Sequence, residues 1–418
     1  MAIYGAYRYV PAPVMATLNP FAALRPRADL ADRVCELPYD VMSSEEARAI
    51  ADGNPYSFLH VSKPEIDLEP DIDVYSAPVY AKGAENFRLL QEQEALLQDP
   101  NPGYYLYRQI MGEHQQTGLV AVASCDEYDQ GIIKKHEFTR PAKEDDRVRH
   151  IEALNSQTGP VFLTYRSVPA FNELFERIAS GAPDVDFTGD DGVRHTSWNI
   201  FSEEDISFIR ESFAEVESLY IADGHHRSAA ASRVNQSRQG EGQSGFFLTV
   251  TFPHDQMQIL AYNRAVKSLN GISPENFLAR LDIVFERSNS ENGNCSMKNE
   301  LGLYLDGKWY RLQFRQEYAQ ADNPMDELDV ALLQNHVLQP VLGIDDPRTS
   351  DRIDFIGGIR GVGELERLVD SGNYACAFSM YPTSIEELMD IADAGGIMPP
   401  KSTWFEPKLR DAMFCHMI

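Results

Sequence analysis

The chain has 418 residues, a formal net charge of -27 and a hydrophobic content of 43%. A chain of this length exceeds one ordinary hydrophobic core, so two or three domains are expected. Proteins bind nucleic acid largely through Lys and Arg side chains that neutralise phosphates, so this acidic balance argues against a nucleic-acid partner. It argues equally against binding to anionic membranes.

Two further features indicate a cytoplasmic protein without a membrane span. No segment approaches the ~20 apolar residues that a span requires, and the first residues lack the basic and apolar pattern of a secretory signal. The five cysteines are scattered and form no C-x-x-C pair. A disulfide framework or a cysteine-rich zinc site is therefore not expected, and a reducing compartment fits best.

Residues 1–103 are predicted to form an N-terminal α/β region. Ser43 and Glu46 have the spacing of a capping box, which predicts a short helix after Ser43. The apolar run at residues 57–61 predicts a strand, and residues 79–97 predict a longer amphipathic helix. The Pro- and Gly-rich stretch that ends at residue 103 marks the first boundary.

Strands and helices alternate over residues 104–270, and a third region covers residues 271–418. Helix starts, a hairpin centred on Asp306-Gly307 and a strand at 374–380 give the third region an α/β character. The fold class is predicted to be α+β, or mixed α/β. In the central region, strands are predicted at 104–109, 118–124, 161–165, 193–200, 219–221, 246–252 and 258–262.

The segment from Tyr220 to Ala231 carries the strongest candidate site. An apolar run ends in Asp223 and a glycine, and His225, His226 and Arg227 then stand at the start of an Ala-rich helix. Helix N-termini attract anions through unpaired N–H groups and the helix dipole, and the basic side chains add to this. Phosphate is the expected anion, and Asp223 is expected to hold a metal ion or accept a proton. The alternative is an ordinary helix cap with solvated histidines.

Two further charged segments offer candidate residues. The first, residues 134–150, precedes and enters a predicted helix and contributes Glu137, Arg140 and His150; its alternative is a solvated charged face. The second, residues 398–408, places Lys401 and Ser402 in a proline-stiffened loop that could grip phosphate. No G-x-x-x-x-G precedes this loop, so it is not a P-loop, and an ordinary tail loop is the alternative.

Several segments together resemble the family known as domain of unknown function 1015. The resemblance extends over nearly the whole chain, and its name implies no activity. It rests on the combination of residues 37–41, 54–61, 135–147, 158–162, 222–227 and 399–408.

The central region is also similar to the archaeal free-serine kinases, which belong with sulfiredoxin and the ParB nucleotidase domain. The likeness rests on the Asp-Gly-His-His-Arg helix start and on the upstream His-Glu pair that ends at Glu137. It implies a ParB/sulfiredoxin-like central domain with additional N- and C-terminal α/β regions. It also implies that Glu137 activates a substrate hydroxyl and that the basic helix start holds nucleotide phosphates. The reactive cysteine of sulfiredoxin is absent, so its redox chemistry is not expected.

The resulting hypothesis is a small-molecule kinase that uses ATP or ADP with Mg²⁺ bound at Asp223. The acceptor is a hydroxyl metabolite such as free serine, and a homo-oligomer is compatible with the sequence. Removal of Arg227 is expected to weaken nucleotide binding with little loss of stability. Two alternatives stay open: a phosphatase or nucleotidase, and a nucleotide-binding regulator without turnover. The remaining cofactor-binding candidates are Arg140, His150, Lys401 and Ser402, and the Lys401 loop is expected to close over the Asp223–Arg227 turn.

Overall fold

The computed structural model describes residues 15–321 and 323–418 and divides into two compact units. Unit 1 comprises Met1–Lys134, Thr139–Asp255 and Leu409–Ile418, and unit 2 comprises Lys135–Phe138 and Gln256–Lys408. The predicted first and central regions both contribute to unit 1, because β1 pairs with β5 within one sheet. That residues 1–103, 104–270 and 271–418 are three separate domains stays a prediction.

Unit 1 is built on a nine-stranded mixed sheet. The strand order is β6-β11-β8-β12-β5-β4-β10-β9, with β1 added beside β5. The pairs β11·β6 and β12·β8 are parallel and the other neighbours are antiparallel, which confirms the mixed α/β class. The strands are β1 (Leu18–Asn19), β4 (Tyr104–Met111), β5 (His114–Ser124), β6 (Ile133–Lys134), β8 (Val161–Tyr165), β9 (Val185–Thr188), β10 (Arg194–Ile200), β11 (Leu219–Asp223) and β12 (Phe246–Pro253).

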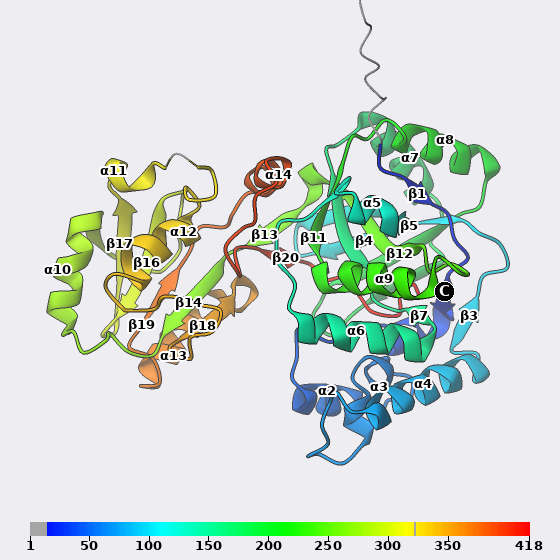
Figure 1. The fold of residues 1–418 in the computed structure, drawn as a ribbon, viewed down its shortest axis with the longest axis horizontal. Helices are drawn as coiled ribbons and strands as arrows, with labels where there is room; N and C mark the ends of the chain where they lie inside the picture. The colour runs from blue at the N-terminus through cyan, green and yellow to red at the C-terminus, as the bar shows by residue number, and fades with distance from the viewer. Residues whose placement is uncertain (1–14, 322) are drawn as a thin grey trace, which may run out of the picture. The chain divides into compact units, whose positions relative to one another are not determined.

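Helices surround this sheet, and two small strand pairs complete the unit (Figure 1). The pairs are β2 (Leu24–Pro26) with β3 (Leu96–Gln98), and β7 (Ser156–Gln157) with β21 (His416–Met417). The helices are η1 (Ala28–Leu30), α1 (Ala31–Val34), α2 (Ser44–Ala51), α3 (Leu59–Ser62), η2 (Pro64–Asp67), α4 (Ala77–Glu92), α5 (Cys125–Asp129), α6 (Pro141–Leu154), α7 (Pro169–Ala179), α8 (Glu203–Phe213) and α9 (His225–Arg238), with η3 (His254–Gln256) at the boundary between the units.

Helices α6 and α9 run side by side in the same direction (Figure 1). Arg140, just before α6, contacts His226 in the first turn of α9. Further along, Arg233 pairs with residues of α6, and Arg238 at the end of α9 hydrogen-bonds Asn155 at the end of α6. Because the helices are parallel, both N-termini lie at the same end of the pair.

The predicted strand at residues 57–61 is wrong, since residues 59–62 form the short helix α3 and the two residues before it belong to no strand. Phe58, Leu59 and Val61 are fully buried, and Phe58 and Val61 pack in one cluster with Phe87 of α4. A short apolar run buried on several sides has no clear period, so periodicity cannot separate strand from helix. The capping box at Ser43 and Glu46 is confirmed.

The last ten residues of the chain belong to unit 1. Strand β21 pairs with β7, and the backbone of Asp411 exchanges hydrogen bonds with Glu36. The N–H of Ala412 donates to the carbonyl oxygen of Thr158 at 2.9 Å. These contacts fix Asp411 beside the loop that precedes β8.

Unit 2 has a six-stranded sheet of order β15-β17-β16-β19-β14-β18 and a separate pair, β13 with β20. Its core includes apolar residues of the sheet and of α13. Among the described residues, no helix has the length and apolar character needed to span a bilayer. The elements are β13 (Gln258–Leu260), β14 (Tyr262–Val266), α10 (Pro274–Val284), β15 (Phe285–Ser290), β16 (Glu300–Leu305), β17 (Lys308–Phe314), α11 (Gln316–Ala319), α12 (Asp329–Leu333), η4 (Gln334–Leu338), β18 (Ile353–Gly357), η5 (Gly358–Arg360), α13 (Gly361–Asp370), β19 (Cys376–Ser379), α14 (Ile385–Asp393) and β20 (Trp404–Glu406).

Candidate functional site

The turn between β11 and α9 is the centre of the candidate site in unit 1. Gly224 is the N-cap residue of α9 and has φ +97°, a conformation that side chains with a Cβ rarely adopt. A Cβ at this position would lie 3.3 Å from the Cα of Val161. Glycine is therefore favoured by the backbone angle, and a Cβ would in addition fit tightly against β8.

Asp223 stands at the last position of β11, and its Oδ1 accepts the N–H of Gly224 at 2.8 Å. This bond holds the carboxylate at the turn. In the described structure no side chain caps the N-terminus of α9, and the first turn carries no acidic residue. The positive end of the α9 dipole is thus not offset by a local carboxylate from the helix itself.

The N-terminal ends of α6 and α9 meet at His226. The backbone N–H of Arg140 donates to His226 Nε2 at 3.1 Å. Since Nε2 accepts this bond, the neutral His226 ring carries its proton on Nδ1. Burial lowers the pKa of His226, although Asp40 and Glu144 favour the charged form. His226 therefore joins the two helix starts as a neutral ring, while the Arg140 side chain is exposed beside them.

Arg227 turns inward from the helix start. Its guanidinium donates to the carbonyl oxygen of Pro160 and is half-buried. Burial opposes its charge, but Asp40, Asp223 and Asp411 outweigh this effect and raise the pKa of Arg227. The sequence predicted that Arg227 could be removed with little loss of stability. The inward position of its side chain does not support that prediction.

Arg227 lines a cavity of about 30 Å³ inside unit 1. A volume of this size holds one or two water molecules and excludes a nucleotide. A nucleotide at this site would therefore lie outside the cavity. The lining residues are Tyr39, Arg147, His150, Ile151, Gln157, Thr158, Gly159, Val161, Arg227, Phe247, Leu248 and Asp411.

Asp411 and Arg147 are the buried charged residues of this cavity. Burial raises the pKa of Asp411 to about 7, against the opposing influence of Arg227. The guanidinium of Arg147 lies 3.7 Å from the ring centroid of Tyr39 and forms a two-point ion pair with its neighbour Asp146. Such stacking and pairing fix the position of Arg147.

His150, a predicted cofactor ligand, lines the same cavity but is used in packing. It is 5% exposed, and its Nε2 lies 3.1 Å from the carbonyl oxygen of Val61. Burial lowers the pKa of His150 to about 3, so the ring is neutral and donates this bond. Its direct role in cofactor binding stays a prediction. His225 is also buried, with 5% of its surface exposed.

Three predicted residues belong to unit 2. Glu137 is half-buried and follows His136, whose carbonyl oxygen accepts the N–H of Met398 at 2.8 Å. Lys401 is exposed, whereas the hydroxyl of Ser402 is buried and donates to the carbonyl oxygen of Pro399 at 2.6 Å. The predicted approach of Lys401 and Ser402 to the Asp223–Arg227 turn stays a prediction.

Sequence reasoning missed Tyr39, Asp40 and Asp411 as residues of the site. Tyr39 and Asp40 lie in residues 37–41, one of the segments on which the family resemblance rests. That resemblance marked the segment but indicated no function for its residues. Asp411 had no local signal, because only the return of the tail to unit 1 brings it near Arg227.

The described residues contain no group of three or more His, Cys, Asp or Glu side chains arranged to hold a metal ion. Magnesium often takes only one or two carboxylates from the protein and its other ligands from water and substrate phosphates. Asp223, held at the turn, fits this second kind of site but not a protein-only metal cage.

Comparison with solved structures gives weak likenesses. A free serine kinase in complex with AMP has 14% identity and a TM-score of 0.35, covering 68% of this chain and 86% of that chain. SbnI with C-terminal truncation from Staphylococcus aureus has 11% identity and a TM-score of 0.40, covering 70% and 85%. A conserved hypothetical protein from Pyrococcus furiosus has 14% identity and a TM-score of 0.34, covering 70% and 93%.

Comparison with known sequences identifies the family. No curated protein matches the chain. The family described as protein of unknown function (DUF1015) matches residues 18–331, which is most of the chain and includes the Asp223–Arg227 turn. The chain belongs to the DUF1015 family.

Proposed function

We propose that the protein is a nucleotide-dependent phosphotransferase. The shared N-terminal end of α6 and α9 holds the phosphates of ATP or ADP, and a hydroxyl metabolite such as free serine accepts the phosphoryl group. The observation that supports this most is the bond from the Arg140 N–H to His226, which joins two parallel helix starts. Two dipoles with their positive ends together favour an anion more than one does.

The residues fit the requirements of phosphoryl transfer, which are mainly positioning and neutralisation of charge. The exposed Arg140 side chain is proposed to contact phosphate oxygens. Arg227 adds positive charge from the inner side of the turn between β11 and α9. Asp223 is proposed to hold Mg²⁺, which neutralises phosphate charge when bound. Glu137 is proposed to accept the proton of the attacking hydroxyl.

The experiment combines the purified protein with Mg²⁺, ATP or ADP and a panel of hydroxyl metabolites that includes serine. Phosphorus NMR then distinguishes the products. A phosphorylated metabolite supports the kinase. Release of inorganic phosphate alone assigns a phosphatase or nucleotidase, and nucleotide binding without either product assigns a regulator.

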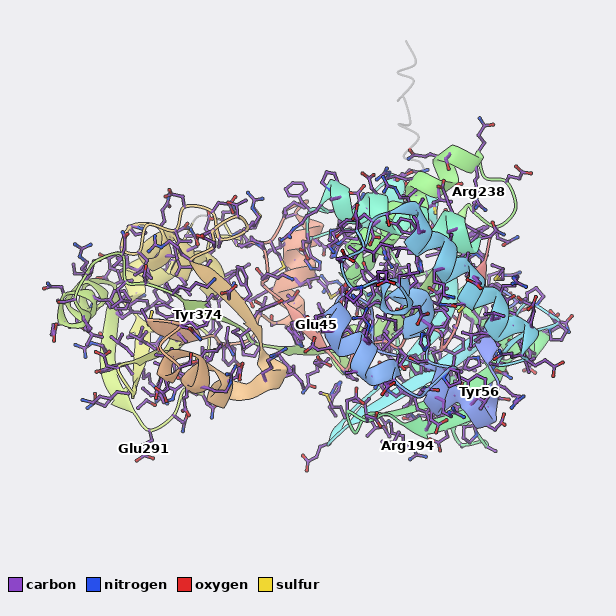
Figure 2. All side chains as sticks on the ribbon, turned by 90° about the horizontal axis from the view of Figure 1, so that it is seen from below. Glu45, Tyr56, Arg194, Arg238, Glu291 and Tyr374 are labelled. Atoms are coloured by element: carbon purple, nitrogen blue, oxygen red, sulfur yellow. The ribbon has the colours of Figure 1, made fainter. Side chains whose placement is uncertain are left out.

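A matched pair of arginine variants tests whether the nucleotide phosphates bind at the N-terminal end of α6 and α9. Arg140→Ala removes a cation at the start of the helix pair, and Arg238→Ala removes one at its other end, where Figure 2 labels Arg238. Calorimetric titration is expected to show about tenfold weaker nucleotide binding for Arg140→Ala, the loss of one charged hydrogen bond. Arg238→Ala is expected to bind like the wild type. Equal affinities for the two variants would place the nucleotide elsewhere.

A further inference from the structure

Unit 1 has a groove of about 390 Å³ that shares no lining residue with the cavity at Arg227. Its walls come from the end of α2, the turn at residues 53–55, helix α3 and helix η2. The turn and α3 contain most of residues 54–61, a segment on which the family resemblance rests and which the proposed function does not use. The groove therefore gives this segment a place in the structure that still lacks a role.

His60 of α3 joins two walls of the groove through both of its ring nitrogens. Nδ1 lies 2.8 Å from Oδ1 of Asp67 in η2, and Nε2 lies 3.2 Å from the carbonyl oxygen of Asn54 in the turn. An ionised carboxylate and a carbonyl oxygen only accept hydrogen bonds. A neutral ring has one N–H and donates one of these bonds, whereas an imidazolium donates both. The contacts therefore favour a positively charged His60. We call this arrangement of Asn54, His60 and Asp67 the His60 bridge.

The groups around the ring favour its charged form. The hydrogen bond to Asp67 raises the pKa of His60, burial opposes this in part, and the Asn54 carbonyl oxygen and Glu36 raise the pKa further. Burial opposes the charge of Asp67, but His60 and Asn86 outweigh this and hold the pKa of Asp67 below its usual value. Asn86 of α4 donates to Asp67 Oδ2 at 2.7 Å and to the carbonyl oxygen of His60 at 2.7 Å. The acid that faces the ring is thus itself held in place as an anion.

The other charged groups of the groove walls do not touch the ring. Arg48 of α2 donates to two carbonyl oxygens of η2. Lys63 pairs with Glu65 at 3.2 Å, and Asp52 is exposed. Among the described residues, Asp67 is the only acid within ion-pair distance of the ring.

The remaining elements packed around α3 add no second titration near neutral pH. Lys82 of α4 pairs with Glu85 at 3.1 Å and also favours the ionised form of Asp67. Arg33 of α1 contacts the side chain of Asn54 at 3.4 Å. His150 of α6 bonds the carbonyl oxygen after His60 as a neutral ring, because burial lowers its pKa to about 3. The charge that changes near neutral pH in this region is therefore that of His60.

Loss of the His60 proton changes the bridge in a defined way. The neutral ring keeps its N–H on Nδ1, toward the ionised Asp67, and the lone pair of Nε2 then faces the lone pairs of the Asn54 carbonyl oxygen. One hydrogen bond is replaced by a repulsion. The Asn54 carbonyl keeps its bond from the N–H of Ser57 at 3.1 Å, so the turn stays folded while its attachment to the ring is lost.

We propose that the His60 bridge is a pH-sensitive tie that fixes the groove wall. With the proton, the ring connects the turn at residues 53–55 to η2; without it, the turn and α3 loosen and the groove changes shape. Since the pKa of His60 is raised, the tie is fully present below the usual histidine pKa of ~6.5 and is lost as pH rises through the raised pKa. The proposal does not depend on the function proposed for the Asp223–Arg227 turn.

Two measurements on the full chain test the proposal. Nitrogen-15 NMR of the histidine side chains is expected to show His60 with both ring nitrogens protonated at about pH 7 and a titration midpoint above ~6.5. Hydrogen exchange, corrected for its intrinsic dependence on pH, is expected to show a fall in the protection of residues 53–60 between about pH 6 and about pH 9. The His60 and Asp67 side chains are each 23% exposed, so solvent reduces the effect of one charged hydrogen bond to about three- to tenfold.

Matched variants assign the change to His60. His60→Gln is expected to remove the pH dependence, whereas His114→Gln, at the β4–β5 hairpin, is expected to retain it. Asp411 titrates in the same range and is present in every variant. Asp67→Asn keeps the histidine and is expected to move its midpoint to lower pH, which preserves the test if His60→Gln does not fold.

Three results would overturn the proposal. The first is a His60 midpoint at or below ~6.5 in the wild type. The second is the same fall in protection in His60→Gln as in the wild type. The third is an unchanged midpoint in Asp67→Asn, which would mean that Asp67 does not hold the proton on the ring.

Discussion

At the scale of single residues, the candidate site combines side chains with different tasks. His226 joins two helix starts through a neutral ring, whereas Arg227 turns away from the surface and pairs with Pro160. Arg140 keeps its side chain exposed at the same place. Two neighbouring basic residues of one motif thus make structural contacts, whereas Arg140 is the residue that we propose to contact phosphate directly.

We predict that Arg227→Ala lowers the free energy of unfolding by about 1–3 kcal/mol, because it leaves the carbonyl oxygen of Pro160 without this donor and removes one of the two arginines, Arg227 and Arg147, that act on the buried Asp411. Denaturant unfolding measures this loss. The control is Arg194→Ala, which breaks an ion pair with Asp186 at the surface, where Arg194 is labelled in Figure 2. That change is expected to cost less than about 0.5 kcal/mol. Equal losses in the two variants would contradict an inward Arg227.

We predict a pH effect at Asp411, whose pKa burial raises from 3.8 to about 7. The folded chain then holds this proton more tightly than the unfolded chain does. Stability is therefore lost as pH rises from about 4 to about 7 and is constant above that range. Asp411→Asn removes the titration, so its stability relative to the wild type is expected to increase by roughly 1–4 kcal/mol between pH 5 and pH 8.

The comparison with the wild type isolates Asp411 from other groups. Burial also raises the pKa of Asp329 in unit 2 to about 7, and that carboxyl is present in both proteins. Denaturant titrations at several pH values give the difference directly. A difference that does not change with pH would show that Asp411 is ionised in the folded chain throughout.

At the scale of elements, the strand-to-helix turn and the parallel pairing of α6 with α9 define the site. The turn places Asp223 and the start of α9 beside β8, and the pairing adds the start of α6. Parallel helices repel through their dipoles, so ion pairs along their length, such as Arg233 with Glu144 and Asp145, help to hold them together.

We predict that Gly224→Ala destabilises the chain by about 1–3 kcal/mol, because φ +97° is strained for alanine and the new Cβ would approach Val161. The matched change Gly245→Ala meets only an ordinary contact of 3.9 Å with Asn235. It is expected to alter stability by less than about 0.5 kcal/mol. Denaturant unfolding compares the two, and an unaffected Gly224→Ala variant would mean that the turn tolerates another backbone conformation.

At the scale of the whole molecule, the candidate residues are shared between two compact units. The segment Lys135–Phe138 belongs to unit 2, although the residues before and after it belong to unit 1. The tail returns to unit 1 after Lys408. The chain therefore passes between the units several times, and each unit contains segments that are far apart in the sequence.

We predict that Glu137→Gln leaves nucleotide affinity unchanged and lowers turnover by roughly 10²–10⁴-fold, the usual effect of a positioned base. Calorimetry and the phosphorus NMR assay measure the two quantities separately. Glu113→Gln, at an exposed turn between β4 and β5, is the control and is expected to retain full activity. Full activity of Glu137→Gln would show that another group accepts the proton.

The sequence by itself determined the features that depend on local physics. The helix start at Ser43, the strand at residues 219–221 and the basic start of α9 follow from caps, apolar runs and the freedom of glycine, all of which act over a few residues. Only the tertiary structure decided that α3 is helical, that Arg227 turns inward and that Asp411 lies beside it. These outcomes depend on burial and on contacts between segments that are distant in the sequence, and the local sequence carries no signal for such contacts.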